Sequence, residues 1–392
     1  MKKVLFTTIL SLILAVSIFS VSSAKTVITE NSKVKIVIDG KIGQYKDVPL
    51  NIDGRTMLPL VEILNNLGIA NDGESIVWNG KERSITISTD TTKINLKIGV
   101  KTAYVNDTAF SIDVAPMIYS KNNRTYIPVA FVAKSLGKKV LWDGSLSTVL
   151  IRSQNGFDET KTILTKAKDA LIKLNRFKVA GNVKIEMGNS SFSINGNINL
   201  ASEIDQQNRK LHSLTKTNMV GMTVNIENYY DNNIIYSNGG FMSFDSSWEK
   251  KSVSKEEYLK ELDAGINDNF ISISESLCAG LVIKDGYNEN ELLLEGDIYS
   301  NDLFKSFMES NSLGSNEDSD MVSKFNMSIY LDKNTFLVTQ IHMKMEAITE
   351  LGKTKVPASI DITAEYSDYN KDFEINVPED VKESAVEEEP WY

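Results

Sequence analysis

The spacing of hydrophobic residues differs between two regions of the chain. From residue 25 to 153, short segments of strand length, such as 34–38 and 94–98, flank two segments in which apolar residues recur every three or four positions. The strand-length runs indicate β-strands, and the wider spacing indicates amphipathic helices. The first region therefore predicts a small domain of short strands and two short helices.

The two helical segments are copies of one sequence. Residues 55–68 (RTMLPLVEILNNLG) match residues 124–137 (RTYIPVAFVAKSLG), and Trp78 and Trp142 follow at similar distances. Each copy predicts a strand, a helix and two more strands, because proline is tolerated in the first turn of a helix and glycine suits its left-handed C-terminal cap. We expect Trp78 and Trp142 to be buried over the helices at equivalent positions.

The second region has a different pattern. After a helical segment over 163–174, apolar and polar residues alternate in a series of segments between residues 177 and 366. Strict alternation predicts antiparallel strands in a sheet with one apolar face and one solvent-facing face. Residues 254–257, Ser-Lys-Glu-Glu, have the capping-box pattern that begins a helix. Helices are therefore expected to cover the apolar face.

These patterns predict an α+β fold, in which a small duplicated strand-helix-strand domain is followed by a large antiparallel, half-barrel-like sheet covered by helices. Two domains agree with the length of 392 residues, which exceeds what one hydrophobic core usually supports. The expected boundaries are 1–24 for a signal peptide, 25–153 for the duplicated domain, 154–385 for the sheet domain and 386–392 for an acidic tail.

The first residues have the order of a secretory signal peptide. A Lys-Lys pair at 2–3 precedes an apolar run over 4–21, and the small residues Ser22 and Ala24 suit a signal peptidase. We therefore expect an exported protein, extracellular or cell-wall-associated, whose mature chain begins at Lys25. The alternative is an uncleaved membrane anchor, since the apolar run is nearly long enough to cross a bilayer.

The composition argues against several partners and chemistries. The formal net charge of −10 becomes more negative once the two leader lysines are removed, which argues against nucleic acid or anionic lipid as a partner. The single cysteine, Cys278, lies among apolar residues and is expected to be a buried, inert thiol. His212 and His342 lie in separate strand-like segments, and no phosphate loop, zinc-ligand spacing or nucleophile motif is present. We expect no catalytic residue, metal or cofactor.

The duplicated segments resemble the copper amine oxidase-like N-terminal domain, the stalk domain of secreted proteins from Gram-positive bacteria. The shared motif is the Arg-Thr-x-hydrophobic-Pro-hydrophobic helix, the Leu-Gly pair and a later Trp followed by Asp or Asn, here at Trp78-Asn79 and Trp142-Asp143. The resemblance covers about residues 33–152. It implies an accessory or wall-proximal module and not an oxidase, because copper is normally held by imidazoles.

The second region resembles the fold of periplasmic lipoprotein carriers and of mycobacterial lipid-binding lipoproteins, and residues 364–381 are similar to the ending of an uncharacterised family of secreted Firmicute domains. This resemblance covers about residues 157–385 and implies a hydrophobic cavity between the sheet and the helices. Nine of the twelve methionines lie in this region. Methionine is frequent at adaptable apolar binding surfaces, and it also serves as a filler of ordinary cores.

Three classes of function remain. The first is a protein that binds a lipid or other apolar ligand between sheet and helices. The second is a cell-surface scaffold or adhesion protein, with a cell-wall or surface-protein partner and no small-molecule ligand. The third is an enzyme without a recognisable motif. A ligand-sized apolar cavity favours the first class, whereas a filled core with an exposed patch favours the second. The residues expected to line the cavity are Met222, Val224, Ile226, Met327, Ile329, Met343 and Met345.

Overall fold

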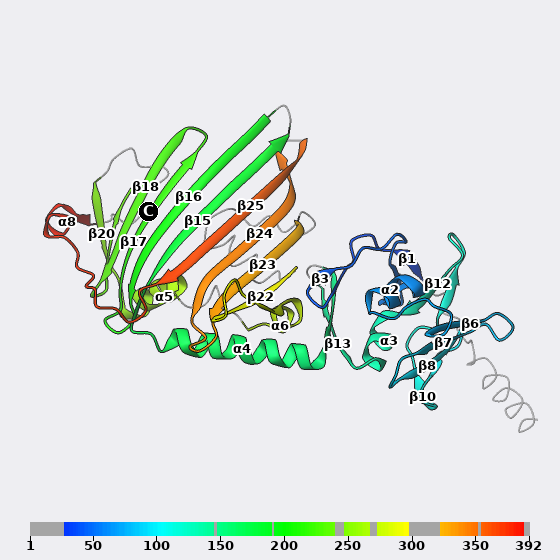
Figure 1. Cartoon of the computed structure of the whole chain (residues 1–392). Coiled ribbons are helices and arrows are strands. Elements are labelled where there is room, and N and C mark those ends of the chain that lie inside the picture. Colours follow the sequence, from blue (N-terminus) through cyan, green and yellow to red (C-terminus); the bar gives the residue numbers. More distant parts are fainter. Residues whose placement is uncertain are drawn as a thin grey trace, which may run out of the picture.

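The computed structural model describes residues 27–144, 147–189, 192–239, 247–266, 273–297, 322–351 and 354–387. The expected signal peptide at 1–24 and most of the expected acidic tail, residues 388–392, lie outside these ranges. The α+β fold is confirmed: a strand-rich N-terminal domain precedes one large sheet that is antiparallel almost throughout (Figure 1). None of the helices in the described ranges has both the length and the apolar composition needed to cross a membrane.

The N-terminal domain contains three small sheets and two helices, α2 (Leu60–Asn66) and α3 (Val129–Ser135). The first sheet has the strand order β1 (Ile28–Glu30), β4 (Leu50–Ile52), β5 (Arg55–Pro59), β12 (Arg124–Pro128) and β11 (Met117–Tyr119). The second has the order β10 (Thr108–Ser111), β9 (Thr102–Val105), β8 (Lys93–Lys97), β7 (Ser84–Ser88) and β6 (Ile76–Asn79). The third has the order β13 (Lys138–Asp143), β14 (Thr148–Ser153), β2 (Lys35–Ile38) and β3 (Lys41–Ile42).

The duplication is visible in the structure. Each copy is a strand, a helix and two strands, as the sequence predicts, and each helix begins directly after its proline. Gly68 and Gly137 follow the helices with φ of +84° and +73°, a conformation that favours glycine because it has no Cβ. The two copies meet at β5 and β12, which pair antiparallel with Tyr126 opposite Pro59 and Pro128 opposite Met57.

The expected burial of the two tryptophans is wrong. Trp78 and Trp142 do occupy equivalent positions, near the ends of β6 and β13, but they are 45% and 54% exposed. Each is paired with a buried residue, Ile85 or Val149, so each indole starts on the core side of its sheet. However, β6 and β13 are the outermost strands of their sheets. The indoles therefore lie at the rim of the core and face solvent.

The large sheet has twelve strands within the described ranges. All of its strand pairs are antiparallel except β20 with β26. The long strands β15 and β25, from opposite ends of this region of the sequence, pair in the middle of the sheet. The strand order is β21 (Val282–Asp285), β22 (Glu291–Asp297), β23 (Val322–Asp332), β24 (Val338–Leu351), β25 (Thr354–Ser367), β15 (Arg176–Asn189), β16 (Phe192–Asp205), β17 (Lys210–Met219), β18 (Met222–Asp231), β19 (Ile234–Asn238), β20 (Trp248–Ser252) and β26 (Val386–Glu387).

Among the described residues, the helices that accompany this sheet are α4 (Gln154–Ile172), α5 (Lys255–Ile266), α6 (Glu275–Gly280) and α8 (Glu379–Ser384). The α4 helix follows β14 without a linker and runs along one end of the sheet (Figure 1). The Ser153 hydroxyl accepts a hydrogen bond from the Gly156 amide and so caps α4. The predicted cap of α5 is confirmed, because Ser254 accepts from the Glu257 amide.

One hydrophobic cluster crosses the junction between the N-terminal domain and the large sheet, beside the N-terminal domain's own core. Val37 and Leu150 of the first domain pack in the same buried cluster as Phe157 of α4 and Leu277 of α6. Cys278 lies in this cluster at 1% exposure, and burial raises the pKa of its thiol, as expected for an inert cysteine. The two domains are therefore joined by packing as well as by the chain.

Candidate functional site

The large sheet has an inner face, toward α4, α5 and α6, and an outer face that carries most of its polar residues. Residues that are directly opposite each other on neighbouring strands have side chains on the same face, so the strand register defines rows across the sheet. Three consecutive inner rows cross the seven strands from β23 to β18. They are Phe325–Met345–Ile360–Ile185–Gly196–Met219–Met222, Met327–Met343–Ile362–Val183–Ile198–Thr217–Val224 and Ile329–Ile341–Ala364–Gly181–Leu200–Thr215–Ile226.

All seven residues expected to line a cavity lie in these three rows, but at opposite ends of them. Met222, Val224 and Ile226 stand on β18, and the other four stand on β23 and β24. Five strand spacings separate β18 from β24, which is about 24 Å at the usual spacing. The structure thus places the seven residues on one face without bringing them into one contact group.

The β23–β24 end of the rows is closed. Met327 and Ile329 are 0% exposed, and Met345 and Met343 are 4% and 8% exposed, within the core that α4 and α6 complete. Their neighbours Leu281 and Leu294 are also fully buried. This part of the inner face is a filled core.

The β16–β18 end of the rows is only partly covered, although Thr217 of β17 is 7% exposed and Gly196 of β16 is buried. Met222 is 60% exposed and Leu200 is 37% exposed, while Val224 and Ile226 are half-buried. No position in the three rows has an ionisable side chain. This end is therefore an uncharged and mainly apolar surface on a strongly acidic chain, in which Thr215 and Thr217 of β17 are the polar positions.

Several residues between the two ends were not among the expected lining residues. They are the β15 and β16 residues Val183, Ile185, Ile198 and Leu200, with Ile360 and Ile362 of β25. Their alternation shows that they share one face of their own strands, but the pairing of β15 with β25 joins residues that are almost 180 positions apart in the sequence. The pattern within each strand could identify these residues as inward-facing, whereas their place in the rows depends on the strand order.

Family models match both regions of the chain. Residues 37–151 match the Copper amine oxidase N-terminal domain, which confirms the resemblance of the duplicated segments. This is the part of those oxidases that does not carry the catalytic centre. Residues 159–386, more than half of the chain, match a family of unknown function, DUF6612. The chain belongs to the DUF6612 family. None of the curated protein sequences is significantly similar to it.

Solved structures similar to this DUF6612 protein include the carrier-like proteins that its sequence resembles. A LolA superfamily protein from Nitrosomonas europaea is 12% identical with a TM-score of 0.18, over 55% of this chain and 94% of that chain. A domain from Vibrio parahaemolyticus named for outer membrane lipoprotein sorting is 10% identical with a TM-score of 0.21, over 56% and 95%.

The two histidines of the DUF6612 sheet lie on its outer face. The His212 Nε2 is 2.9 Å from the Glu227 Oε1, and the His212 ring stacks on Tyr229 with 4.3 Å between centroids. The His342 Nε2 is 2.9 Å from the Asp361 Oδ1. Each imidazole thus has a carboxylate partner on a neighbouring strand, and among the described residues no three His, Cys, Asp or Glu side chains gather as metal ligands would.

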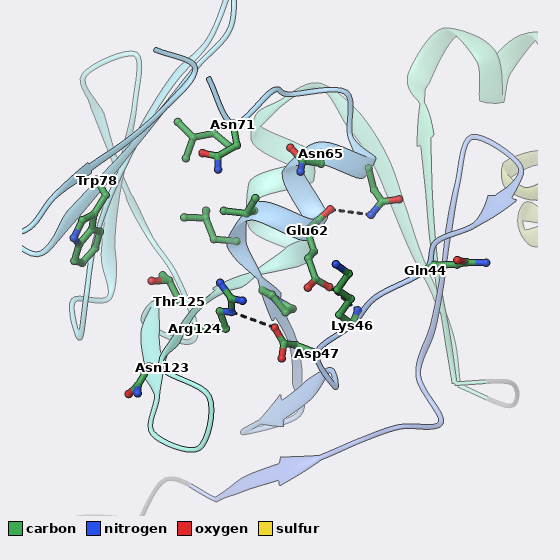
Figure 2. A pocket seen from close by; sticks show the side chains of 15 residues that line it. Gln44, Lys46, Asp47, Glu62, Asn65, Asn71, Trp78, Asn123, Arg124 and Thr125 are labelled. Atoms are coloured by element: carbon green, nitrogen blue, oxygen red, sulfur yellow. Dashed lines mark hydrogen bonds and ion pairs between the residues drawn. The ribbon is translucent and has the colours of Figure 1, made fainter. Parts of the chain in front are cut away.

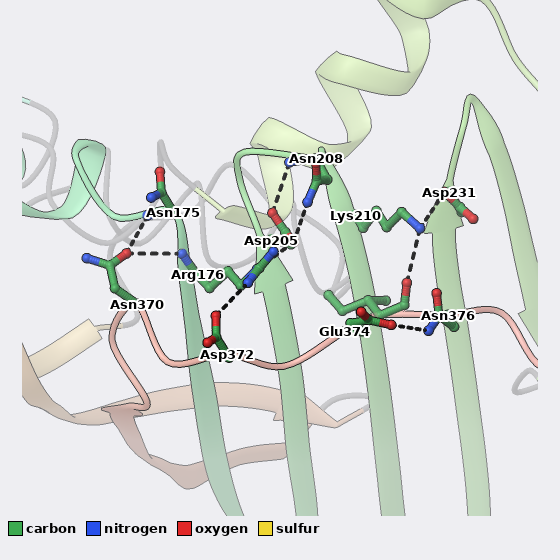
Figure 3. Close-up of polar contacts among 11 residues, drawn as sticks. Asn175, Arg176, Asp205, Asn208, Lys210, Asp231, Asn370, Asp372, Glu374 and Asn376 are labelled. Atoms are coloured by element: carbon green, nitrogen blue, oxygen red, sulfur yellow. Dashed lines mark hydrogen bonds and ion pairs between the residues drawn. The ribbon is translucent and has the colours of Figure 1, made fainter.

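A polar cluster around Asp205 fixes the end of the DUF6612 sheet near α4 (Figure 3). Asp205 is 2% exposed, and its carboxylate accepts hydrogen bonds from the Arg176 Nε at 2.7 Å and the Asn208 backbone amide at 2.9 Å. Burial alone would raise the pKa of Asp205, but these hydrogen bonds outweigh it and hold the pKa below its ordinary value. The cluster therefore holds the start of β15 against the end of β16, at the end of this strand pair opposite its turn.

Replacing Asp205 by Ala should lower the free energy of unfolding by about 2 kcal/mol at neutral pH, because charge-assisted hydrogen bonds are lost and Arg176 is left without its buried partner. The folded-state pKa of Asp205 is lowered, so its contribution is present above the ordinary aspartate pKa of about 4 and is lost as the pH falls through the folded value. Urea unfolding at about pH 7 and pH 3 should show the difference between wild type and variant narrowing in acid.

The matched control for this experiment is Asp372→Ala. Asp372 also pairs with Arg176, at 3.4 Å, but its side chain is fully exposed, so the change should stay below about 1 kcal/mol. An Asp205→Ala difference that is equally large at both pH values would contradict the assignment of the lowered pKa.

Proposed function

We propose that this protein is an exported, non-catalytic protein of the cell envelope that binds an apolar ligand, such as a lipid acyl chain, on the inner face of its large sheet. The observation that carries the proposal is the contrast between the two ends of the inner rows. Four of the predicted lining residues complete a packed core on β23 and β24, whereas Met222, Val224 and Ile226 continue the same apolar rows into the open. The signal-peptide pattern of residues 2–24 supports the export.

An exposed apolar surface on an acidic protein usually marks a binding site, since it would otherwise promote aggregation. The exposed apolar residues Leu200 and Met222 stand on β16 and β18, which lie two strand spacings apart, or roughly 10 Å. A strip of that width accommodates one or two extended hydrocarbon chains side by side. The absence of charge in the rows suits the hydrocarbon part of a lipid and not its headgroup, because an apolar environment disfavours charged groups.

Direct binding to the purified mature chain tests the proposal. A fluorescent fatty acid should bind with about one site per chain, and Leu200→Gln or Met222→Gln should weaken binding by roughly tenfold, because each places an amide group against the ligand without a hydrogen-bond partner. The control is Leu214→Gln. Leu214 lies near Leu200 with a similar exposure of 43%, but its register places it on the outer face, opposite Ala201 and Glu227.

Two outcomes contradict the proposal. In the first, the folded wild-type chain takes up no fatty acid. In the second, Leu200→Gln and Leu214→Gln weaken fatty-acid binding equally. The first result would favour the alternative, a cell-surface scaffold without a small-molecule ligand. The second would mean that the probe binds elsewhere on the sheet.

A further inference from the structure

The duplication of the N-terminal domain builds two reciprocal pockets. Because β5 and β12 pair antiparallel with Tyr126 opposite Pro59, the beginning of β12 lies beside the first turn of α2. By the same register, the beginning of β5 lies beside the first turn of α3. Each copy therefore contributes an Arg-Thr pair to the helix and tryptophan of the other copy.

The first pocket has a volume of about 620 Å³ (Figure 2). Trp78 forms one side and Glu62 of α2 lies on another, with Arg124 and Thr125 of the second copy between them. The Arg124 Nε is 3.5 Å from the Asp47 Oδ2, and this ion pair fixes the guanidinium at the pocket wall. The other polar lining residues are Gln44, Lys46, Asn65, Asn66, Asn71 and Asn123.

The second pocket repeats this plan with the two copies exchanged and has a volume of about 460 Å³. Trp142 takes the place of Trp78, and Arg55 with Thr56 takes the place of Arg124 with Thr125. The Arg55 Nε donates to the Asp113 Oδ2 at 2.7 Å, so this arginine is also held by an aspartate. Phe131 of α3 stands at the position of Glu62, which makes the second pocket more aromatic.

The lining groups indicate the chemistry of a ligand. Each pocket offers an indole that is about half exposed, which is a flat apolar surface with one N–H donor. The first pocket adds side-chain amides, which both donate and accept hydrogen bonds, and among the described residues the amides of Asn65 and Asn71 make no hydrogen bond. Its two basic residues, Lys46 and Arg124, are balanced by Asp47 and Glu62.

A ring with hydroxyl groups fits this set better than the alternatives. In the first pocket a phosphate would find no uncompensated positive charge, and a lipid chain would leave the side-chain amides without hydrogen-bond partners. The second pocket has Arg55 and Lys134 against Asp113, and its Trp142 and Phe131 favour the flat face of a ring. A sugar ring places its C–H face on an indole, while its hydroxyls both donate to and accept from amides, carboxylates and a guanidinium. We propose that the two pockets are binding sites for the units of a neutral glycan, one site at Trp78 and Arg124 and the other at Trp142 and Arg55.

Isothermal titration of the purified chain with chitohexaose and with cellohexaose tests this assignment. At least one of these neutral hexasaccharides should bind at two sites per chain. Trp78→Ala should remove one site and Trp142→Ala the other, each weakening its own site by at least about tenfold, because a central aromatic contact is lost. The double variant should bind neither sugar, and inorganic phosphate should bind to none of the proteins.

The matched control is Tyr104→Ala, because Tyr104 is an aromatic residue of the same domain with a similar exposure of 46% and lines neither pocket. It should leave both sites unchanged. Thermal melts show whether each variant is folded. If the Trp78→Ala variant is unfolded, Arg124→Gln replaces it in the test and should weaken binding at the same site. The Arg124 side chain is 69% exposed, so its replacement leaves the core intact. The proposal is overturned if the wild type binds neither hexasaccharide, or if binding survives in the double tryptophan variant.

Discussion

Replacing Phe157 by Ala should lower the free energy of unfolding by about 3–5 kcal/mol, the range for removing a large buried aromatic ring. Phe157 is 3% exposed in the first turn of α4, and the Lys139 ammonium group lies 4.3 Å from the centroid of its ring. It packs in the cluster that contains Val37 and Leu150 from the N-terminal domain and Leu277 from α6. The loss should therefore destabilise both domains and not one.

Urea unfolding followed by far-UV circular dichroism measures this effect in the full chain. Wild type is expected to unfold with both domains coupled, and the variant is expected to show an earlier or separated transition, because the shared core holds them together. Ile172→Ala, at the other end of the same helix and 56% exposed, should change the stability by less than about 0.5 kcal/mol. A loss below about 1 kcal/mol for Phe157→Ala would show that the domains do not share a core.

The sequence predicted the elements of the N-terminal domain because local rules determine them. Proline before each helix, glycine after it and the repeated apolar spacing specify where α2 and α3 begin and end. The exposure of Trp78 and Trp142 could not be obtained in this way, because it depends on β6 and β13 being outermost strands. The two pockets depend on the register between β5 and β12, which is also a property of the folded domain.

In the large sheet, the face on which a residue lies could be predicted from the sequence, but its burial could not. Alternation assigned Met327, Met343 and Met222 to the inner face, and the rows of the sheet place all three there. It could not show that the first two are covered by α4 and α6 while the third is open, since each of the three strands has the same period of two. Burial differs along one face because the helices cover only part of it.

The contact between the domains is a feature that the sequence did not reveal. The Asp297 amide donates to the Gly40 carbonyl at 2.7 Å, and the Asp297 carboxylate accepts from the Ile42 amide at 3.1 Å. Gly40, at φ +76°, leaves no room for a Cβ beside Val282, and a Cβ on Gly296 would clash with the Gly280 carbonyl. Single glycines of this kind have no pattern around them, because the close approach brings Gly40 against residues 280–296, which are distant from it in the chain.

The closed and open ends of the inner rows should differ in how much a new carboxylate lowers the free energy of unfolding. Met343→Glu should lower the free energy of unfolding by at least about 4 kcal/mol, because it places a carboxylate among Met327, Ile362 and other core residues with no basic partner in the three rows. Met222→Glu introduces the same carboxylate at a position that is 60% exposed, so its cost should be below about 1 kcal/mol. Urea unfolding of the two variants under identical conditions measures the contrast.

Because only the Met222 variant is expected to remain folded, it is also the variant in which lost fatty-acid binding reports on the ligand site and not on the fold. Equal stability of the two variants would mean that the β23–β24 end is as open as β18, and the ligand surface would then extend over all seven strands.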